Sequence, residues 1–311
     1  MKAKASVQQF RGWLWVMFPP KMRQSSILLL WMGVGLLLNS CGILRPAPKD
    51  LPSIDKPSYV RLVTENSDQT LRITFLSALP VDSYLHVYSE NDTLQAWLNA
   101  QNPLILPAGG QISTTAFPYS NEYQLRKWRL TLRATSYIGN PKTVEPDTQY
   151  TYTLPFLPGK TYRIMQGYHG SFSHNKPRSR YAIDFAMPVG DTVCAARGGV
   201  VAYFSENSRI GGNHLAYLPY SNNLMILHDD GTVALYAHLS YQGVLVELGE
   251  RVEQGQAIAI SGETGFADGA HLHFTLLAPR ERELVSIPLT FSQFSGAELT
   301  QMKRITREIQ P

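Results

Sequence analysis

The sequence predicts a mainly β protein, with a small β-sandwich-like N-terminal domain followed by a compact antiparallel β domain. Short segments in which apolar and polar residues alternate recur from Tyr59 to Phe291, separated by clusters of Asn, Asp, Gly, Ser and Pro. The second half of the sequence has no amphipathic helical pattern of convincing length. A length of 311 residues, with 44% hydrophobic and 17% charged residues, suits two packed domains.

The charge and the cysteines of the chain exclude two classes of protein. The formal net charge is only +4, and no run of five or more like charges occurs in the sequence, so we expect no nucleic-acid partner. Only two cysteines, Cys41 and Cys194, are present, which excludes a disulfide framework. Cys194 lies in an apolar run, and we expect it to be a small buried hydrophobe.

Residues 1–41 are interpreted as a signal peptide that ends in a lipobox cysteine. The uncharged apolar stretch Ile27–Leu38 follows Lys21 and Arg23 and is short for a bilayer span. The tetrapeptide LNSC resembles a bacterial lipobox, which predicts that Cys41 receives a lipid. An uncleaved membrane anchor is the alternative, and both interpretations export the rest of the chain.

The residues around this signal bear on the location of the protein. Gly42, next to Cys41, does not resemble an inner-membrane retention signal. We therefore expect an outer-membrane lipoprotein that faces the periplasm and contacts the membrane through its lipid anchor. A cell-surface lipoprotein is the alternative. Met22 would begin a signal of conventional length, so the start codon stays open.

The next two segments predict a tether and a β domain. Residues 42–58 are rich in proline and almost without periodicity, as is typical of an extended tether. Residues 59–157 contain the alternating segments YVRLVTE, LRITFLS, SYLHVYS, KWRLTLRAT and TQYTYTLPF, which predict the strands of a small antiparallel sandwich. The histidine in this domain, His86, lies mid-strand and is interpreted as structural. We expect a separately folding spacer or binding module that the chemistry does not need.

Residues 158–311 carry the candidate chemistry, because seven of the eight histidines fall there. His271 and His273 lie two apart in a strand pattern, so their side chains share a face. His238 ends the segment TVALYAH, and Asp184 lies in the apolar segment YAIDFAMP. A buried carboxylate is costly unless it is paired or bound to a metal. His228, before a turn, is interpreted as structural.

Four segments in this region together resemble the lysostaphin-type (LytM) murein metallopeptidases, the peptidoglycan DD-endopeptidase family. They are YAIDFAMPVGDTVCAARGGVV, NNLMILHDDGTVALYAHLS, VEQGQAIAISGETG and DGAHLHF. The resemblance implies an antiparallel β metallopeptidase domain whose groove holds one zinc ion on two histidines and one aspartate. It further implies that Asp184 and His273 are zinc ligands, and that His238 and His271 are catalytic histidines that do not bind the metal.

The first zinc ligand departs from the commonest form of that family, which has histidine four residues before the aspartate. Arg180 stands at that position, and arginine cannot bind zinc. Some relatives carry the histidine further back, and His174, ten residues before Asp184, then fills the role. His169 is the alternative ligand.

The predicted function is zinc-dependent hydrolysis of peptide bonds in peptidoglycan cross-links or stem peptides. Zinc on three protein ligands keeps an open position for water and for the scissile carbonyl. His271 is assigned as the general base and His238 as the transition-state stabiliser, with the reverse left open. The rival function is a catalytically silent cell-wall-binding protein that activates a separate murein amidase. Cell-wall remodelling proteins are possible partners, and the bond that is cut and the oligomeric state stay open.

Overall fold

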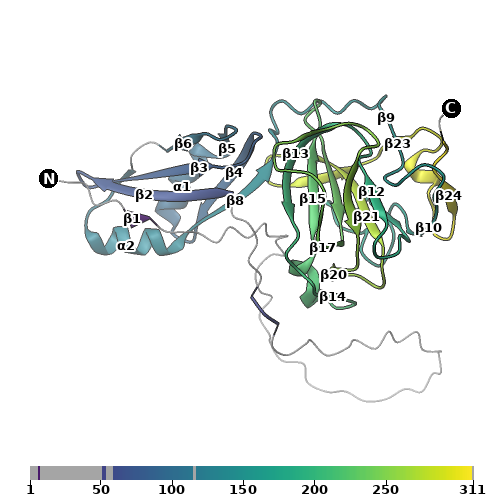
Figure 1. Cartoon of the computed structure of the whole chain (residues 1–311). Coiled ribbons are helices and arrows are strands. Elements are labelled where there is room, and N and C mark those ends of the chain that lie inside the picture. Colours follow the sequence, from purple (N-terminus) through teal and green to yellow (C-terminus); the bar gives the residue numbers. More distant parts are fainter. Residues whose placement is uncertain (1–5, 8–50, 54–58, 115–116, 310–311) are drawn as a thin grey trace, which may run out of the picture.

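The structure of the chain is a computed structural model that describes residues 6–7, 51–53, 59–114 and 117–309. The described residues form an N-terminal part and a larger C-terminal part, which lie side by side (Figure 1). Cys41, most of the expected signal peptide and most of the expected tether lie outside the described residues. Within the described ranges, none of the helices has the length and apolar character needed to cross a membrane.

The N-terminal part contains two small sheets and two helices. One sheet has the order β1-β2-β3-β6, with β7 beside β3, and the other has the order β5-β4-β8. The strands and helices are β1 (Ser6–Val7), β2 (Val60–Ser67), β3 (Thr70–Ser77), β4 (Ser83–Ser89), α1 (Asp92–Gln101), β5 (Leu104–Leu106), β6 (Gln111–Ser113), β7 (Phe117–Pro118), α2 (Glu122–Thr131) and β8 (Leu132–Ile138). Apolar side chains from both sheets and both helices share one core.

The two helices correct the expectation of strands alone in this part. The alternation of Trp128, Leu130 and Leu132 with polar residues predicts a strand over KWRLTLRAT, and only the end of that segment, from Leu132 onward, lies in a strand, β8. In the structure Trp128 is buried on helix α2, whereas Leu130 is 60% exposed. The side chain of Asn121 caps α2 by accepting a hydrogen bond from the Gln124 amide. The N-cap and the three-residue spacing of the buried Leu125 and Trp128 favour a helix here, although apolar and polar residues alternate along the segment.

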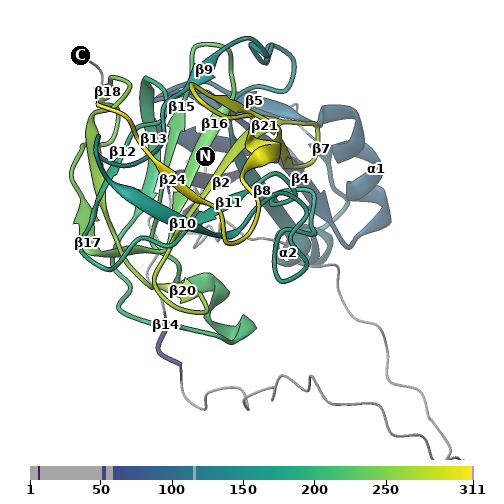
Figure 2. The same cartoon turned by 90° about the vertical axis from the view of Figure 1, so that its right-hand side faces the viewer.

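The C-terminal part is built around a large antiparallel sheet (Figures 1 and 2). Its order is β18-β13-β15-β16-β21-β11-β10-β24, with β22 beside β21. These strands are β18 (Arg251–Val252), β13 (Gly199–Ser205), β15 (Asn223–Leu227), β16 (Val233–Ala237), β21 (Leu272–Pro279), β11 (Ile183–Phe185), β10 (Thr161–Gln166), β24 (Arg304–Thr306) and β22 (Leu284–Ile287). The mainly β fold class predicted from the sequence is confirmed.

Three smaller strand groups complete this part. A sheet of order β12-β19-β17 joins β12 (Thr192–Cys194), β19 (Ala257–Ser261) and β17 (Leu239–Val244). Two parallel pairs join β14 (Gly211–Gly212) to β20 (Gly265–Phe266) and β9 (Thr151–Tyr152) to β23 (Thr290–Phe291). Short 3-10 helices lie at η1 (Leu215–Tyr220) and η2 (Gly296–Glu298). Cys194 is buried, as expected.

The segment before residue 158 packs with the C-terminal part. Tyr152, Leu154 and Phe156 are buried in the main C-terminal core, although the sequence analysis assigned them to the N-terminal domain. Strand β9, which contains Tyr152, pairs with β23 near the C-terminus. The expected strand TQYTYTLPF is thus reduced to the two residues of β9. Its apolar side chains stabilise the domain that follows.

The two faces of the large sheet bury two different cores. Leu224 and Ile226 of β15 face the main C-terminal core, whereas Met225 and Leu227 face a second core. That second core contains residues of the N-terminal part, among them Leu79, Val81 and Ile138. Because strand side chains alternate, the N-terminal part covers the sheet face opposite to the main core. A hydrogen bond from Tyr84 Oη to the Glu283 carbonyl, 2.8 Å long, crosses the same interface.

Candidate metal centre and catalytic histidines

The centre of the candidate site is one transverse row of residues across the large sheet. Asp184 of β11 lies opposite His273 of β21. The row continues to Gln166 of β10 on one side and to Ala237 of β16 on the other. Directly paired residues of an antiparallel ladder point to the same face. Gln166, Asp184, His273 and Ala237 therefore share one face of the sheet.

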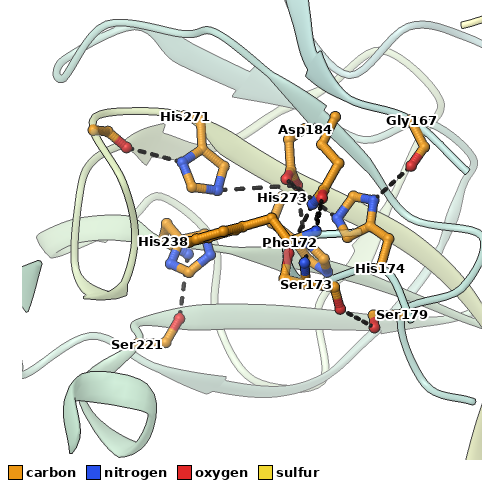
Figure 3. A network of polar contacts seen from close by, with 12 residues as sticks. Gly167, Phe172, Ser173, His174, Ser179, Asp184, Ser221, His238, His271 and His273 are labelled. Atoms are coloured by element: carbon orange, nitrogen blue, oxygen red, sulfur yellow. Dashed lines mark hydrogen bonds and ion pairs between the residues drawn. The ribbon is translucent and has the colours of Figure 1, made fainter. Parts of the chain in front are cut away.

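Three residues of the described chain form a group that could hold a metal ion (Figure 3). One ligand-type atom of each of His174, Asp184 and His273 lies within 4.8 Å of the other two. His273 Nδ1 lies 2.8 Å from Asp184 Oδ1, and His174 Nε2 lies 3.2 Å from Asp184 Oδ2. Asp184 is 5% exposed and His174 is fully buried. The sequence proposed the same three residues as ligands.

The hydrogen bonds of His174 show that the group suits a cation. Its Nδ1 donates to the Gly167 carbonyl at 2.8 Å, so the lone pair of a neutral ring is on Nε2. That atom is buried without a hydrogen-bond partner and faces the Asp184 carboxylate. Two acceptors this close repel each other unless a proton or a metal ion lies between them. The donor set of two imidazoles and one carboxylate is one that zinc and related ions accept.

The pKa values of the three residues His174, Asp184 and His273, called the ligand group below, are shifted by their contacts with one another. Burial would raise the pKa of Asp184, but the neighbouring His273 and His174 rings hold it well below its usual range. Burial would lower the pKa of His174, but the facing Asp184 carboxylate raises it overall. Burial lowers the pKa of His273. The carboxylate is therefore ionised and ready to bind a cation.

His238 and His271 complete the cluster without joining the ligand group. Their ring centroids lie 4.5 Å apart, and His271 Nε2 is 3.9 Å from Asp184 Oδ1. The Nδ1 atoms of both rings donate to backbone carbonyls, that of His238 to Thr264 at 2.7 Å and that of His271 to Gly269 at 2.9 Å. In a neutral ring this arrangement leaves Nε2 as a proton acceptor. Both rings are nearly buried, and Figure 3 shows them beside the ligand group.

The backbone at His238 is held in an unusual conformation. Its φ of 65° is in the left-handed region, which residues other than glycine seldom adopt. The His238 amide donates to Ser221 Oγ, and the Asn222 side chain donates to the carbonyls of Leu239 and Ser240. These bonds fix the strand end that directs the imidazole into the site. Burial, followed by the charges of His271 and His273, lowers the pKa of His238 to about 3, so its ring is neutral near pH 7.

The other histidines lie outside the cluster. The ring of His169, the alternative ligand, contacts the ring of Tyr181, with centroids 5.2 Å apart. His214 caps η1 by accepting a hydrogen bond from the Ala216 amide. His228 is buried, and its Nδ1 donates to the Gly198 carbonyl. Burial lowers the pKa of His228 to about 4.

Sequence reasoning missed Gln166 and Phe172. Gln166 Nε2 donates to Asp184 Oδ2 at 3.2 Å. Phe172 is 52% exposed and stacks on Phe266, with ring centroids 5.2 Å apart, and Figure 3 shows it in front of the histidine cluster. Neither residue type suggests metal chemistry, and only the strand register and the fold of the loop bring them to the site.

Comparisons with known proteins match this part of the chain. Residues 178–284 match the profile of Peptidase family M23. The chain is 35% identical over 113 residues to peptidoglycan DD-endopeptidase ShyA of Vibrio cholerae, covering 35% of this chain and 23% of that protein. It is 40% identical over 94 residues to peptidoglycan DD-endopeptidase ShyC of the same organism, covering 30% of this chain and 19% of that protein. The match thus spans less than a quarter of either relative.

A comparison of structures finds the catalytic domain of the antimicrobial peptidase lysostaphin from Staphylococcus simulans. The two share 23% sequence identity with a TM-score of 0.28, and the match covers 48% of this chain and 94% of that chain.

Proposed function

We propose that this chain, whose residues 178–284 form a domain of peptidase family M23, is a zinc-dependent endopeptidase that hydrolyses peptide bonds of peptidoglycan. The observation that carries the proposal is the joint placement of two sets of side chains. His174, Asp184 and His273 converge as a ligand group, and two further imidazoles with accepting Nε2 atoms lie beside them. A ligand group alone would suit a structural metal site, whereas the added proton acceptors suit hydrolysis.

The choice of zinc rests on the donor set and its spacing. Zinc bonds of about 2.0–2.1 Å in tetrahedral geometry place neighbouring ligand atoms roughly 3.3 Å apart. Asp184 Oδ1 lies 2.8 Å from His273 Nδ1 and Asp184 Oδ2 lies 3.2 Å from His174 Nε2, and one ligand atom of each residue lies within 4.8 Å of the other two, so a small ion could contact all three residues. When bound, zinc would polarise the scissile carbonyl and make water acidic enough to attack near neutral pH.

We assign the proton transfers to the two other histidines. His271 is the proposed general base, because its Nε2 accepts a proton and lies 3.9 Å from Asp184 Oδ1. Burial lowers the pKa of His238 to about 3, so its Nε2 carries no proton at rest. His238 is assigned to stabilise the developing oxyanion, and the proton that this hydrogen bond needs is the one that the attacking water gives to His271, passed on to the adjacent His238 ring.

The proposed substrate is the peptide part of peptidoglycan, in cross-links or stem peptides. The names of the relatives ShyA and ShyC, both peptidoglycan DD-endopeptidases, support this choice. The test is to incubate the purified chain with peptidoglycan, with and without a chelator, and to identify the released peptides. We expect release that stops with the chelator and returns with zinc. Zinc binding without release of peptide from any cell-wall substrate would favour the rival role as activator of a separate amidase.

We further propose that the chain is lipidated at Cys41 and faces the periplasm from the outer membrane. The apolar stretch and the LNSC sequence support this proposal. Replacing Cys41 with Ser should release the protein from membranes. An unchanged membrane-bound fraction would contradict lipidation and point to an uncleaved anchor.

A further inference from the structure

We infer that Gln166 is a positioning residue that joins the ligand Asp184 to the loop that brings in His174. The inference rests on the proposed zinc site and concerns how this chain builds it. Between His174 and Asp184 lie nine residues, rather than the three of the commonest family form, so a longer loop must place the first ligand. Such a loop needs a support on the sheet, because a flexible loop loses conformational entropy when one ligand geometry is selected.

The amide group of Gln166 is fully engaged between the sheet and the loop. Its Nε2 donates to Asp184 Oδ2 at 3.2 Å and to Ser173 Oγ at 2.7 Å. Its Oε1 accepts from the backbone amides of Phe172 and Ser173, at 3.1 and 3.3 Å. One side chain thus contacts a proposed ligand and the two residues that directly precede the other, His174.

The loop is also wrapped closely around the Gln166 side chain. A Cβ at Gly170 would lie 2.1 Å from Gln166 Cγ, so only glycine fits there while Gln166 keeps its position. The His174 amide donates to the Gly170 carbonyl, and His174 Nδ1 donates to the Gly167 carbonyl. The turn that begins at Gly167 therefore closes on His174 with Gln166 inside it.

The physical role of these contacts is to preorganise the ligand group. Partners that hydrogen-bond a metal ligand fix its orientation, and their loss typically weakens metal binding about 10–100-fold. Gln166 fixes one Asp184 oxygen directly and His174 through the loop backbone. Replacement by Met keeps an unbranched side chain of similar length but removes all four hydrogen bonds.

The test is the zinc affinity of the full chain with Gln166→Met, measured by competition with a chelator. We expect zinc to bind about 10–100-fold more weakly than in the wild type. The matched control is Gln256→Met, which removes a glutamine bonded to Glu250 and Glu253 away from the site, and it should bind zinc like the wild type. Zinc-induced stabilisation is a second readout: it should fall in Gln166→Met, whereas a purely structural role would lower the melting temperatures of the metal-free and loaded forms equally.

Gly170→Ala provides an independent variant that keeps Gln166. The added methyl group can be accommodated by displacement of the flexible Gln166 side chain, which should weaken zinc binding although no hydrogen-bonding group is deleted. Wild-type zinc affinity in both Gln166→Met and Gly170→Ala would overturn the inference. A wild-type chain that binds no zinc would instead overturn the proposed metal site, so the two failures are distinguishable.

Discussion

His273 of β21 and Asp184 of β11 lie directly opposite each other in the large sheet, with His273 Nδ1 2.8 Å from Asp184 Oδ1. Both side chains point away from the main core, because their strand neighbours Phe274 and Phe185 are buried in it. They therefore share a sheet face with the residues that contact the N-terminal part further along the strands. The candidate site and the interface between the two parts are built on one surface.

The first prediction concerns the start of the peptidase domain. A fragment of residues 159–311 lacks Tyr152, Leu154 and Phe156, which are buried in the main C-terminal core. Loss of three such side chains removes several kcal/mol of burial energy, at roughly 1.5–3 kcal/mol each. We expect that fragment to be poorly folded, and a fragment of residues 146–311 to be the more stable of the two. Thermal unfolding compares them, and equal melting temperatures would contradict the packing described for this segment.

The second prediction concerns the interface with the N-terminal part. Leu79 is 3% exposed and packs in the core that the two parts share. Leu79→Asp places a carboxylate among apolar side chains of the sheet, and we expect a loss of several kcal/mol of stability in the full chain. The control is Leu130→Asp, because Leu130 is 60% exposed on α2 and its change should be nearly neutral. Urea unfolding measures both variants, and equal effects would argue against a closely packed interface.

The third prediction concerns a buried ion pair that joins the segment before residue 158 to the sheet. Arg197 Nη1 lies 2.7 Å from Asp230 Oδ2 with both side chains nearly buried, and the guanidinium also lies over the Tyr150 ring. Arg197→Met leaves the Asp230 carboxylate with only its hydrogen bonds from Asp147 and Thr232, which should cost about 1.5–3 kcal/mol. The exposed pair of Arg251 with Asp229 provides the control, since Arg251→Met should cost at most about 1 kcal/mol. Chemical denaturation tests the contrast, and similar costs for the two variants would contradict it.

The fourth prediction is a pH dependence of stability that arises from His228. Burial lowers its pKa to about 4, below the usual value of 6.5. Between these two pKa values the unfolded chain binds more protons than the folded chain, so stability falls as pH falls from 6.5 towards 4. The change attributable to His228 is about 3 kcal/mol between pH 7 and pH 4. Urea unfolding of the metal-free chain and of His228→Asn measures it. If the free energy of unfolding depends on pH equally in the two proteins, the contribution assigned to His228 is contradicted.

The alternation of apolar and polar residues predicted the mainly β fold, and the positions of the histidines predicted the candidate site. The match to Peptidase family M23 confirms the family resemblance that the sequence showed. His271 and His273 could be assigned to one face because strand alternation is a local property. Gln166 could not be found in this way, because its place beside Asp184 depends on the register between β10 and β11. Helix α2 was missed because the alternation of Trp128, Leu130 and Leu132 with polar residues fits a strand equally well. Only the structure shows that Leu130 is exposed while Trp128 is buried.

The central claim is that this chain separates metal ligands from proton-transfer residues, and one paired measurement tests it most directly. Zinc content per chain and the rate of peptide release from peptidoglycan are measured for His174→Ala and His271→Ala beside the wild type. We expect His174→Ala to lose both zinc and activity, because it removes one of three protein bonds to the ion. We expect His271→Ala to keep close to one zinc per chain and to lose activity by about 100-fold or more. Full zinc and full activity in His174→Ala, or loss of zinc in His271→Ala, would contradict this division of roles.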